Sequence, residues 1–382
     1  MKKQLILFVV NTVLIFALTG AAVYFMPSLS PRISTAAPSF AVFASPDAAA
    51  DTFKSKFSFD IERSEEQTTN NPDNESAQVM HPTGAKDSDD SWDITATPKD
   101  IKKLMKQAKK SRKKSDYTGK TTEAPYLGGG KVMSWQGVEI QSKIPDSFYK
   151  PDIKALLKKG ADLKIKSKDK PVILIYHSHT TESYALLDEG YYIKSDARSK
   201  DSSRNMVRVG DELVRALEHY GFKVIHDTKI HDLDYNSSYD DSRVSIEKYL
   251  EKYPSVDITI DVHRDAITYS DGTKVKPTAT VDGKKCARMM LIAGCEYGMV
   301  KNYPDWEYNL RFDLQVQNKM QSLYSGVMRP ILFSQRKYNM YETRNSFLLE
   351  IGTDANTLDE ACYSARLFGT ALAKLLDEKY VQ

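Results

Sequence analysis

The sequence predicts an α/β domain with a mostly parallel central sheet flanked by helices on both faces. Short runs rich in Val and Ile, typical of buried strands, alternate with stretches of helical spacing along the later part of the chain. This alternation indicates parallel strands joined by helical crossovers. The first 130 residues lack such stripes, so the folded domain is expected at residues 131–382.

The predicted elements follow one another in order. The first buried strand is expected at 172–176, and the helix at 205–220 stops at Gly221, a frequent helix end. Further strands are expected at 222–227, 256–262, 289–293, 331–333 and 347–351, with a peripheral strand after the glycines at 128–130. Further helices are expected at 242–253, 310–324 and 358–376.

The N-terminus predicts a membrane anchor at residues 1–27. Residues 5–26 are almost entirely apolar, which is about the length that crosses a bilayer. Lys2 and Lys3 precede this run, so the positive-inside rule places the rest of the chain outside the cytoplasm. A cleaved signal peptide is the alternative, because small residues occur at 19–22, and it gives the same extracytoplasmic location.

Residues 28–130 are predicted to be a disordered, partly basic linker. Pro, Ser, Ala, Asp, Asn, Lys and Thr dominate there, and such a composition buries too little apolar surface to offset chain entropy. The stretch 97–114 is strongly basic and has some helical character. It is interpreted either as a solvated part of the linker or as a segment attracted to an anionic wall polymer or lipid.

Charge and cysteine content exclude several classes of protein. The formal net charge of +3 gives no general indication of nucleic-acid binding. The three cysteines, Cys286, Cys295 and Cys362, show no C-x-x-C spacing, which argues against a disulfide framework or a cysteine-rich zinc site. Buried free thiols are expected, with a single Cys286–Cys295 bridge as the alternative.

Residues suited to binding a metal follow two of the predicted strands. His179 and Glu182, three apart in the loop after residue 176, can face one ion, and His263 ends the strand at 256–262. Open α/β sheets collect ligands at such strand ends. Two His and one Glu form an established ligand set for catalytic zinc, which leaves a position open for water. We therefore expect His179, Glu182 and His263 to bind Zn²⁺, with purely structural histidines as the alternative.

Neighbouring residues are assigned supporting roles. Glu350 lies within the apolar strand at 347–351, where burial would raise its pKa toward that of a general base. Arg264 is expected to stabilise an oxyanion or to grip a substrate carboxylate. Asp261 or Asp265 is expected to orient an imidazole. His177 alternates with His179, so the two should point to opposite faces and only one should bind metal.

Three segments, 176–184, 261–266 and 349–361, resemble the stage II sporulation protein P family. The resemblance covers about residues 172–376. That family is a membrane-anchored peptidoglycan hydrolase of endospore-forming Firmicutes, acting during engulfment, and is similar in fold to the zinc N-acetylmuramoyl-L-alanine amidases.

The resemblance to those amidases extends to single residues, with one departure. Their two metal-binding histidines match His179 and His263, and their catalytic Glu matches Glu350. Their glutamate ligand opens the helix that follows, where this sequence has Ser-Ser-Arg-Asn at 202–205. The His-x-x-Glu arrangement instead resembles the zinc carboxypeptidases, so Glu182 is assigned, with Asp201 in reserve.

The resemblance implies a membrane-anchored zinc amidase that cleaves the bond between N-acetylmuramic acid and L-alanine. A zinc endopeptidase acting on stem-peptide cross-links, possession of both activities, or a non-catalytic wall-binding module are the alternatives. It also implies a location between the mother-cell and forespore membranes and, as partners, the stage II sporulation proteins D and M.

Overall fold

The computed structural model describes residues 92–125 and 131–382. The predicted anchor at 1–27, and the predicted linker up to residue 91, lie outside the described residues. Within the part of the chain that is described, no helix has the length and apolar character needed to cross a membrane.

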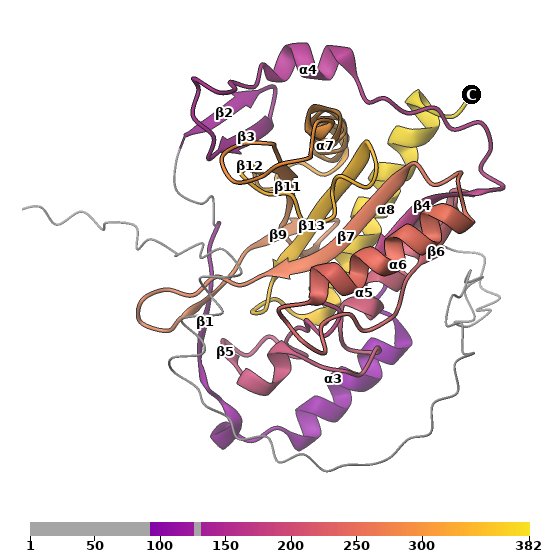
Figure 1. The fold of residues 1–382 in the computed structure, drawn as a ribbon. Helices are drawn as coiled ribbons and strands as arrows, with labels where there is room; N and C mark the ends of the chain where they lie inside the picture. Colours follow the sequence, from indigo (N-terminus) through magenta and orange to yellow (C-terminus); the bar gives the residue numbers. More distant parts are fainter. Residues whose placement is uncertain (1–91, 126–130) are drawn as a thin grey trace, which may run out of the picture. The chain divides into compact units, whose positions relative to one another are not determined.

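An eight-stranded sheet forms the centre of the domain, in the order β2-β3-β12-β11-β13-β7-β4-β6 (Figure 1). Its strands are β2 (Val132–Trp135), β3 (Val138–Ser142), β4 (Pro171–Tyr176), β6 (Lys223–His226), β7 (Ile258–Asp265), β11 (Met289–Gly294), β12 (Ile331–Ser334) and β13 (Asn345–Thr353). The strands expected at the predicted positions are present, with ends that differ by a few residues.

The sheet is mixed, which corrects the prediction of a mostly parallel one. Strands β13, β7, β4 and β6 run parallel to each other, and so do β3, β12 and β11. The two blocks meet at the antiparallel pair β11–β13, and β2 adds a second antiparallel pair at the edge. The type of connection between consecutive strands explains where the direction changes. Helices link β4, β6 and β7 in turn, whereas no helix lies between β7 and β11 or between β12 and β13, so the chain reverses there.

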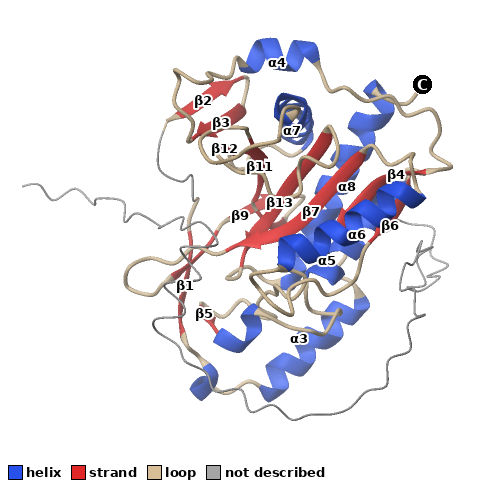
Figure 2. Cartoon of the chain, viewed as in Figure 1, coloured by secondary structure: helices blue, strands red, loops and turns tan. Residues whose placement is uncertain are grey.

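Helices lie on both faces of the sheet, as predicted (Figure 2). Ile173 and Ile175 of β4 belong to the main core, together with residues of α5 (Met206–His219), α7 (Trp306–Leu323) and α8 (Leu358–Lys379). Leu174 and Tyr176, which alternate with them, pack instead with residues of α6 (Ser238–Lys252). Helix α6 therefore covers the β4–β6 end of the second face.

Local signals in the sequence explain where two helices begin. The side chain of Asn205 accepts a hydrogen bond from the Val207 amide at the start of α5. Helix α8 begins with a capping box in which Thr357 and Glu360 each accept a backbone N–H of the first turn. The three cysteines are buried and free, which agrees with the expected thiols.

The described part of the predicted linker is folded, which differs from the expected disorder. It contains α3 (Lys99–Ser111), a short 3₁₀ helix, η2 (Lys114–Asp116), and β1 (Gly119–Glu123). Ile101 is fully buried, and Arg208 of α5 holds Asp100 through two hydrogen bonds of 2.7 and 3.2 Å. The apolar face of α3 is thus part of the main core.

Smaller elements complete the described residues. They are α4 (Ile153–Lys159), β5 (Tyr191–Tyr192), η3 (Lys194–Ala197), β8 (Lys274–Lys276), β9 (Thr278–Val281) and β10 (Lys284–Ala287). Strand β1 lies between β5 and β8 in a three-stranded sheet, and β9 and β10 form a hairpin. Strand β1 therefore ties the N-terminal segment to the loop that follows β4.

Candidate functional site at the carboxyl end of three strands

Three parallel strands, β4, β7 and β13, bring the predicted site residues to one edge of the sheet. Glu350 of β13 stands opposite His263 of β7, and Asp261 of β7 stands opposite Tyr176, the last residue of β4. The loop after Tyr176 carries His179 to the same edge. The register therefore places segments that are far apart in sequence side by side.

His263 and Glu350 point to the same face of the sheet. Partners in register share a face, and neighbouring residues along a strand alternate. Val262 and Leu349, each one position earlier, lie in the main core with α5, α7 and α8. His263 and Glu350 therefore project from the opposite face, on which α6 covers only the end formed by β4 and β6.

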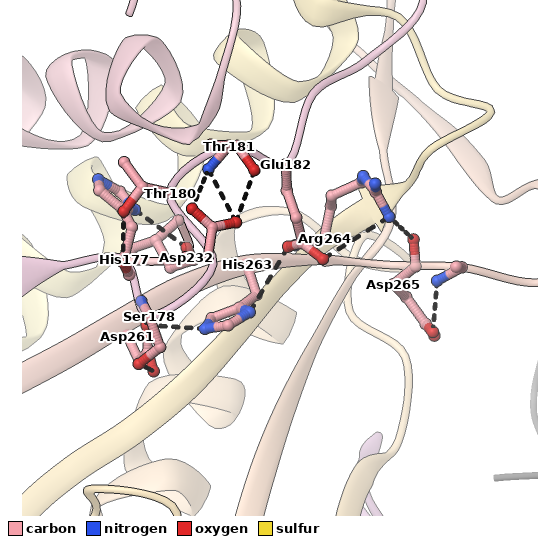
Figure 3. A network of polar contacts seen from close by, with 12 residues as sticks. His177, Ser178, Thr180, Thr181, Glu182, Asp232, Asp261, His263, Arg264 and Asp265 are labelled. Atoms are coloured by element: carbon pink, nitrogen blue, oxygen red, sulfur yellow. Dashed lines mark hydrogen bonds and ion pairs between the residues drawn. The ribbon is translucent and has the colours of Figure 1, made fainter. Parts of the chain in front are cut away.

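His263 lies between two carboxylates (Figure 3). Its Nε2 is 2.8 Å from Asp261 Oδ1, and its Nδ1 is 3.5 Å from Glu182 Oε2. Burial opposes a charged imidazole, yet Asp261 and Glu182 together raise the pKa of His263 well above its usual range. The expectation that Asp261 orients an imidazole thus matches the geometry.

Asp261 also fixes the loop that carries His179. The Ser178 amide donates to Asp261 Oδ1 at 2.9 Å, and the Ser178 hydroxyl donates to Oδ2 at 2.6 Å. One buried carboxylate therefore holds the β4 loop and the β7 imidazole together.

His179 lies beside His263 with one nitrogen unsatisfied. The two ring centroids are 5.3 Å apart and the rings are nearly perpendicular. His179 Nδ1 is buried and has no hydrogen-bond partner. Burial lowers the pKa of His179 to about 4, so the ring is neutral at physiological pH and can offer a lone pair.

Glu182 reaches the cluster from the same loop and is held by Arg264. The Arg264 amide donates to Glu182 Oε2 at 3.3 Å, and its guanidinium Nη1 is 3.8 Å from Oε1. Although burial favours the neutral acid, Arg264 and His263 hold the pKa of Glu182 well below its usual range. Glu182 is therefore an ionised, buried carboxylate.

Arg264 directs its guanidinium at backbone carbonyls. It donates to the carbonyls of Ser183, Ala197 and Asp265 at 3.0, 2.8 and 3.3 Å. Those bonds hold the loop that carries Glu182 against β7. Arg264 therefore holds this loop in place, and its expected oxyanion or substrate role stays a prediction.

Glu350 is half-buried, and its buried Oε2 has no hydrogen-bond partner. Burial raises the pKa of Glu350 to about 8, and the nearby Asp265 carboxylate adds to the rise. Arg329 Nη2 lies 3.0 Å from Asp265 Oδ2 on the same side. A carboxyl group in this setting can both hold and release a proton near neutral pH.

The reserve ligand Asp201 and the alternating histidine His177 both lie outside this cluster. Asp201 is exposed and accepts hydrogen bonds from the amide and hydroxyl of Ser203, so it caps a local turn. His177 points away from His263. Its Nδ1 donates to the Val262 carbonyl at 3.0 Å, and its Nε2 lies 2.9 Å from His226 Nε2.

Aromatic residues enclose the histidines, and two of them, Tyr235 and Tyr239, were not expected from the sequence. Tyr235 stacks on His179 at 4.3 Å between ring centroids, and Tyr239 stacks on Tyr338 at 4.7 Å while facing His263 at 6.3 Å. Tyr235 and Tyr239 flank the start of α6, and Tyr338 lies in the loop before β13. No motif marks them, because their proximity depends on how the loops fold.

The predicted metal ligands are not already arranged around one metal position. Among residues 92–125 and 131–382, no group of three or more His, Cys, Asp or Glu side chains is arranged to hold a metal ion. The donors gathered at the sheet edge are nevertheless those that zinc prefers, namely imidazole nitrogen and carboxylate oxygen.

Comparison of the sequence with known proteins gives a family and a relative. Residues 47–373 match the family model of stage II sporulation protein P. The chain is 32% identical over 225 residues to stage II sporulation protein P of Bacillus subtilis (strain 168). That match covers 56% of this chain and 52% of the relative, so the chain spans about half the length of the curated relative.

Solved amidase structures are less similar to this chain than the Bacillus subtilis relative is. The CwlD amidase of Clostridioides difficile, in complex with the GerS lipoprotein, is 14% identical, with a TM-score of 0.34, over 55% of this chain and 100% of that one. The catalytic domain of CwlV, an N-acetylmuramoyl-L-alanine amidase of Bacillus (Paenibacillus) polymyxa var. colistinus, is 13% identical, with a TM-score of 0.32, over 55% and 99%. TM-scores this low carry no argument about the fold. The fold is therefore described by the sheet order and the helices given above.

Proposed function

The chain belongs to the stage II sporulation protein P family, and from that premise we propose that it is a peptidoglycan hydrolase of sporulation. The bond that we propose it cleaves is the amide between N-acetylmuramic acid and L-alanine. The observation that carries the proposal is the pairing of His263 with Glu350 on one face of the sheet, with His179 beside them.

We propose that His179, Glu182 and His263 hold a zinc ion. Two observations support this. The buried Nδ1 of His179 lacks any partner, and the two nitrogens of His263 face different carboxylates. Bound zinc would displace the Nδ1 proton of His263, and Asp261, 2.8 Å from Nε2, would then support the ring from its other side, as a carboxylate commonly supports a histidine ligand. Bound zinc would supply a water of lowered pKa and polarise the scissile carbonyl.

We assign proton transfer, positioning and exclusion of water to side chains of the protein itself. In this proposal Glu350 accepts a proton from the attacking water and passes it to the leaving amine, which its unpartnered Oε2 supports. Arg264 keeps Glu182 in place by holding the carbonyls of its loop. Tyr239 and Tyr235 cover the imidazoles and limit bulk water there.

The proposed location follows from residues outside the described part of the chain. We propose that residues 1–27 anchor the protein in the membrane and that the enzyme domain lies outside the cytoplasm, in the space between mother-cell and forespore membranes. Stage II sporulation proteins D and M are its proposed partners.

The test is digestion of purified peptidoglycan by the full-length chain. Release of free L-alanyl amino ends supports the amidase. A population of shorter cross-linked muropeptides would favour the endopeptidase, and absence of new ends would favour a wall-binding module. His263→Ala and Glu350→Gln are each expected to lower cleavage at least about 100-fold, the usual scale of lost acid–base or metal chemistry. Exposed His219→Ala is the matched control and should cleave like the wild type. Cleavage by His263→Ala near the wild-type rate would contradict the site.

A further inference from the structure

Helix α3 presents a row of exposed lysines on its outer side. Seven lysines of α3 and the residues just after it are exposed, and their ammonium groups have no ion-pair or hydrogen-bond partner within the described residues: Lys102, Lys103, Lys106, Lys109, Lys110, Lys113 and Lys114. Residues 99–116 contain nine Lys or Arg against two Asp, a net charge of +7 in a chain of +3. The rest of the chain therefore carries −4, so the positive charge is concentrated at this helix.

The lysine row is not explained by the stability of the helix. Lys106 has lysines three or four positions away on both sides, at 102, 103, 109 and 110, and such like-charge neighbours destabilise a helix. Some lysines elsewhere, such as Lys284 with Asp359 and Lys319 with Glu378, are paired. Only Lys109 and Lys110, in the last turn, are favoured by the helix dipole, so helix stability does not explain the rest of the row.

The opposite side of α3 is fixed to the domain. Ile101 and Ala108 are buried, Leu104 and Met105 pack against the core, and Asp100 is bound by Arg208. The apolar face is thus already occupied and is not free to enter a bilayer. What remains outside is a rigid, linear array of ammonium groups about 20 Å long.

We propose that the lysine row of α3 binds a linear polyanion, a polymer of repeating phosphodiester or carboxylate groups such as occurs in cell walls. A linear ligand can follow the row and pair with lysines on successive turns, each about 5.4 Å along the axis. Binding would release counterions and so weaken steeply with salt. The inference stands apart from the proposed hydrolysis, because it concerns binding alone.

The helix is also joined to the loop that carries Glu182. Arg112, just after α3, pairs with Asp196 at 2.6 Å, and Asp196 in turn pairs with Arg204 at 3.2 Å. Strand β1 continues the connection by pairing with β5 of the same loop. A polymer held on α3 is therefore tethered to the segment that builds the candidate site.

The test is binding of inorganic polyphosphate to the full-length chain in nonionic detergent. Replacing Lys102, Lys103, Lys106 and Lys110 by Gln should weaken binding at least about tenfold at low salt and reduce the slope of log K against log salt by about three, at roughly 0.7 per lost contact. The control replaces Lys150, Lys154, Lys158 and Lys164 by Gln. These are exposed lysines in and around α4, and this variant should stay within about threefold of wild type.

Two results would overturn the proposal. Equal loss of affinity in both quadruple variants would mean that net charge, not the α3 row, governs binding. Displacement of polyphosphate by micellar phosphatidylglycerol at an equal concentration of phosphate groups would assign the row to an anionic lipid surface instead. A melting temperature of the α3 variant at or above that of wild type, as expected when like charges are removed, shows that the loss is one of binding and not of folding.

Discussion

Single buried charges in this protein fall into two kinds, those with partners and those without. Asp261 is paired twice, to Ser178 and to His263, so its desolvation is offset by hydrogen bonds. Glu350 Oε2 and both carboxylate oxygens of Asp313 are buried without hydrogen-bond partners. Such groups cost folding free energy, and Glu350 lies where the proposed chemistry needs it, whereas Asp313 lies in α7 with no partner for either oxygen.

Asp313 should therefore make stability depend on pH. Burial raises the pKa of Asp313 well above its usual range. A raised folded-state pKa means that the native protein binds the proton more tightly, so stability present below about pH 4 is lost as pH rises toward the folded pKa, by about 1.4 kcal/mol per pH unit. Asp313→Asn removes this loss, and its stability relative to wild type should grow with pH.

Denaturant unfolding of Asp313→Asn and wild type at several pH values measures that difference. Taking the difference between the two proteins removes the contribution of all other titrating groups. A difference that stays constant from about pH 5 to pH 8 would show that Asp313 does not titrate in this range.

At the scale of elements, the loop after β4 depends on one arginine. Arg264→Lys keeps the charge but loses the planar fork that binds the carbonyls of Ser183 and Ala197. If Arg264 positions Glu182, the variant should bind zinc about 10- to 100-fold more weakly, as with other residues that support metal ligands. Cleavage at saturating zinc should largely recover.

Zinc titration of the Arg264→Lys chain provides the measurement. Arg344→Lys, at an exposed arginine paired with Asp162 and Asp305, is the matched control. Unchanged zinc affinity combined with a lost catalytic rate would instead support the oxyanion role expected from the sequence.

Helices and strands with a clear local pattern of apolar residues could be predicted from the sequence. Features that depend on pairing between distant strands could not. The apolar run of β4 and the helical spacing of α5 lie at their predicted positions. The reversed direction of β11 depends on its pairing with β13, about 60 residues later in the chain, which no local pattern encodes. Helix α3 has a visible stripe, Ile101, Leu104, Met105 and Ala108, but its lysines led to its assignment as linker.

The candidate site likewise contains residues that could be selected from local sequence and contacts that depend on distant parts of the chain. His179, Glu182, His263 and Glu350 could be selected because each follows or ends an apolar strand, and the structure brings them to one edge. The role of Arg264 could not be read from the sequence, because the carbonyls that it binds, those of Ser183 and Ala197, belong to a loop 60 or more residues earlier. Tyr235 and Tyr239 were missed for the same reason.

The molecule as a whole places a basic helix and a histidine–carboxylate cluster on one folded unit that begins before residue 131. Arg366 of α8 donates to the carbonyls of Ile94 and Ala96, so the segment before α3 is bonded to the last helix of the domain. We propose that the enzyme domain starts near residue 92. This leaves a shorter tether than the sequence indicated between the domain and the proposed anchor.

The central claim is that three side chains from two separate parts of the chain share one zinc ion. Metal analysis by mass spectrometry on the full-length protein, after equilibration with zinc and removal of excess, tests it directly. We predict about one zinc ion per chain in the wild type and in His219→Ala, and a large loss in His179→Ala and His263→Ala. A wild-type chain without bound zinc, or a His263→Ala chain that keeps its full complement, would contradict the account.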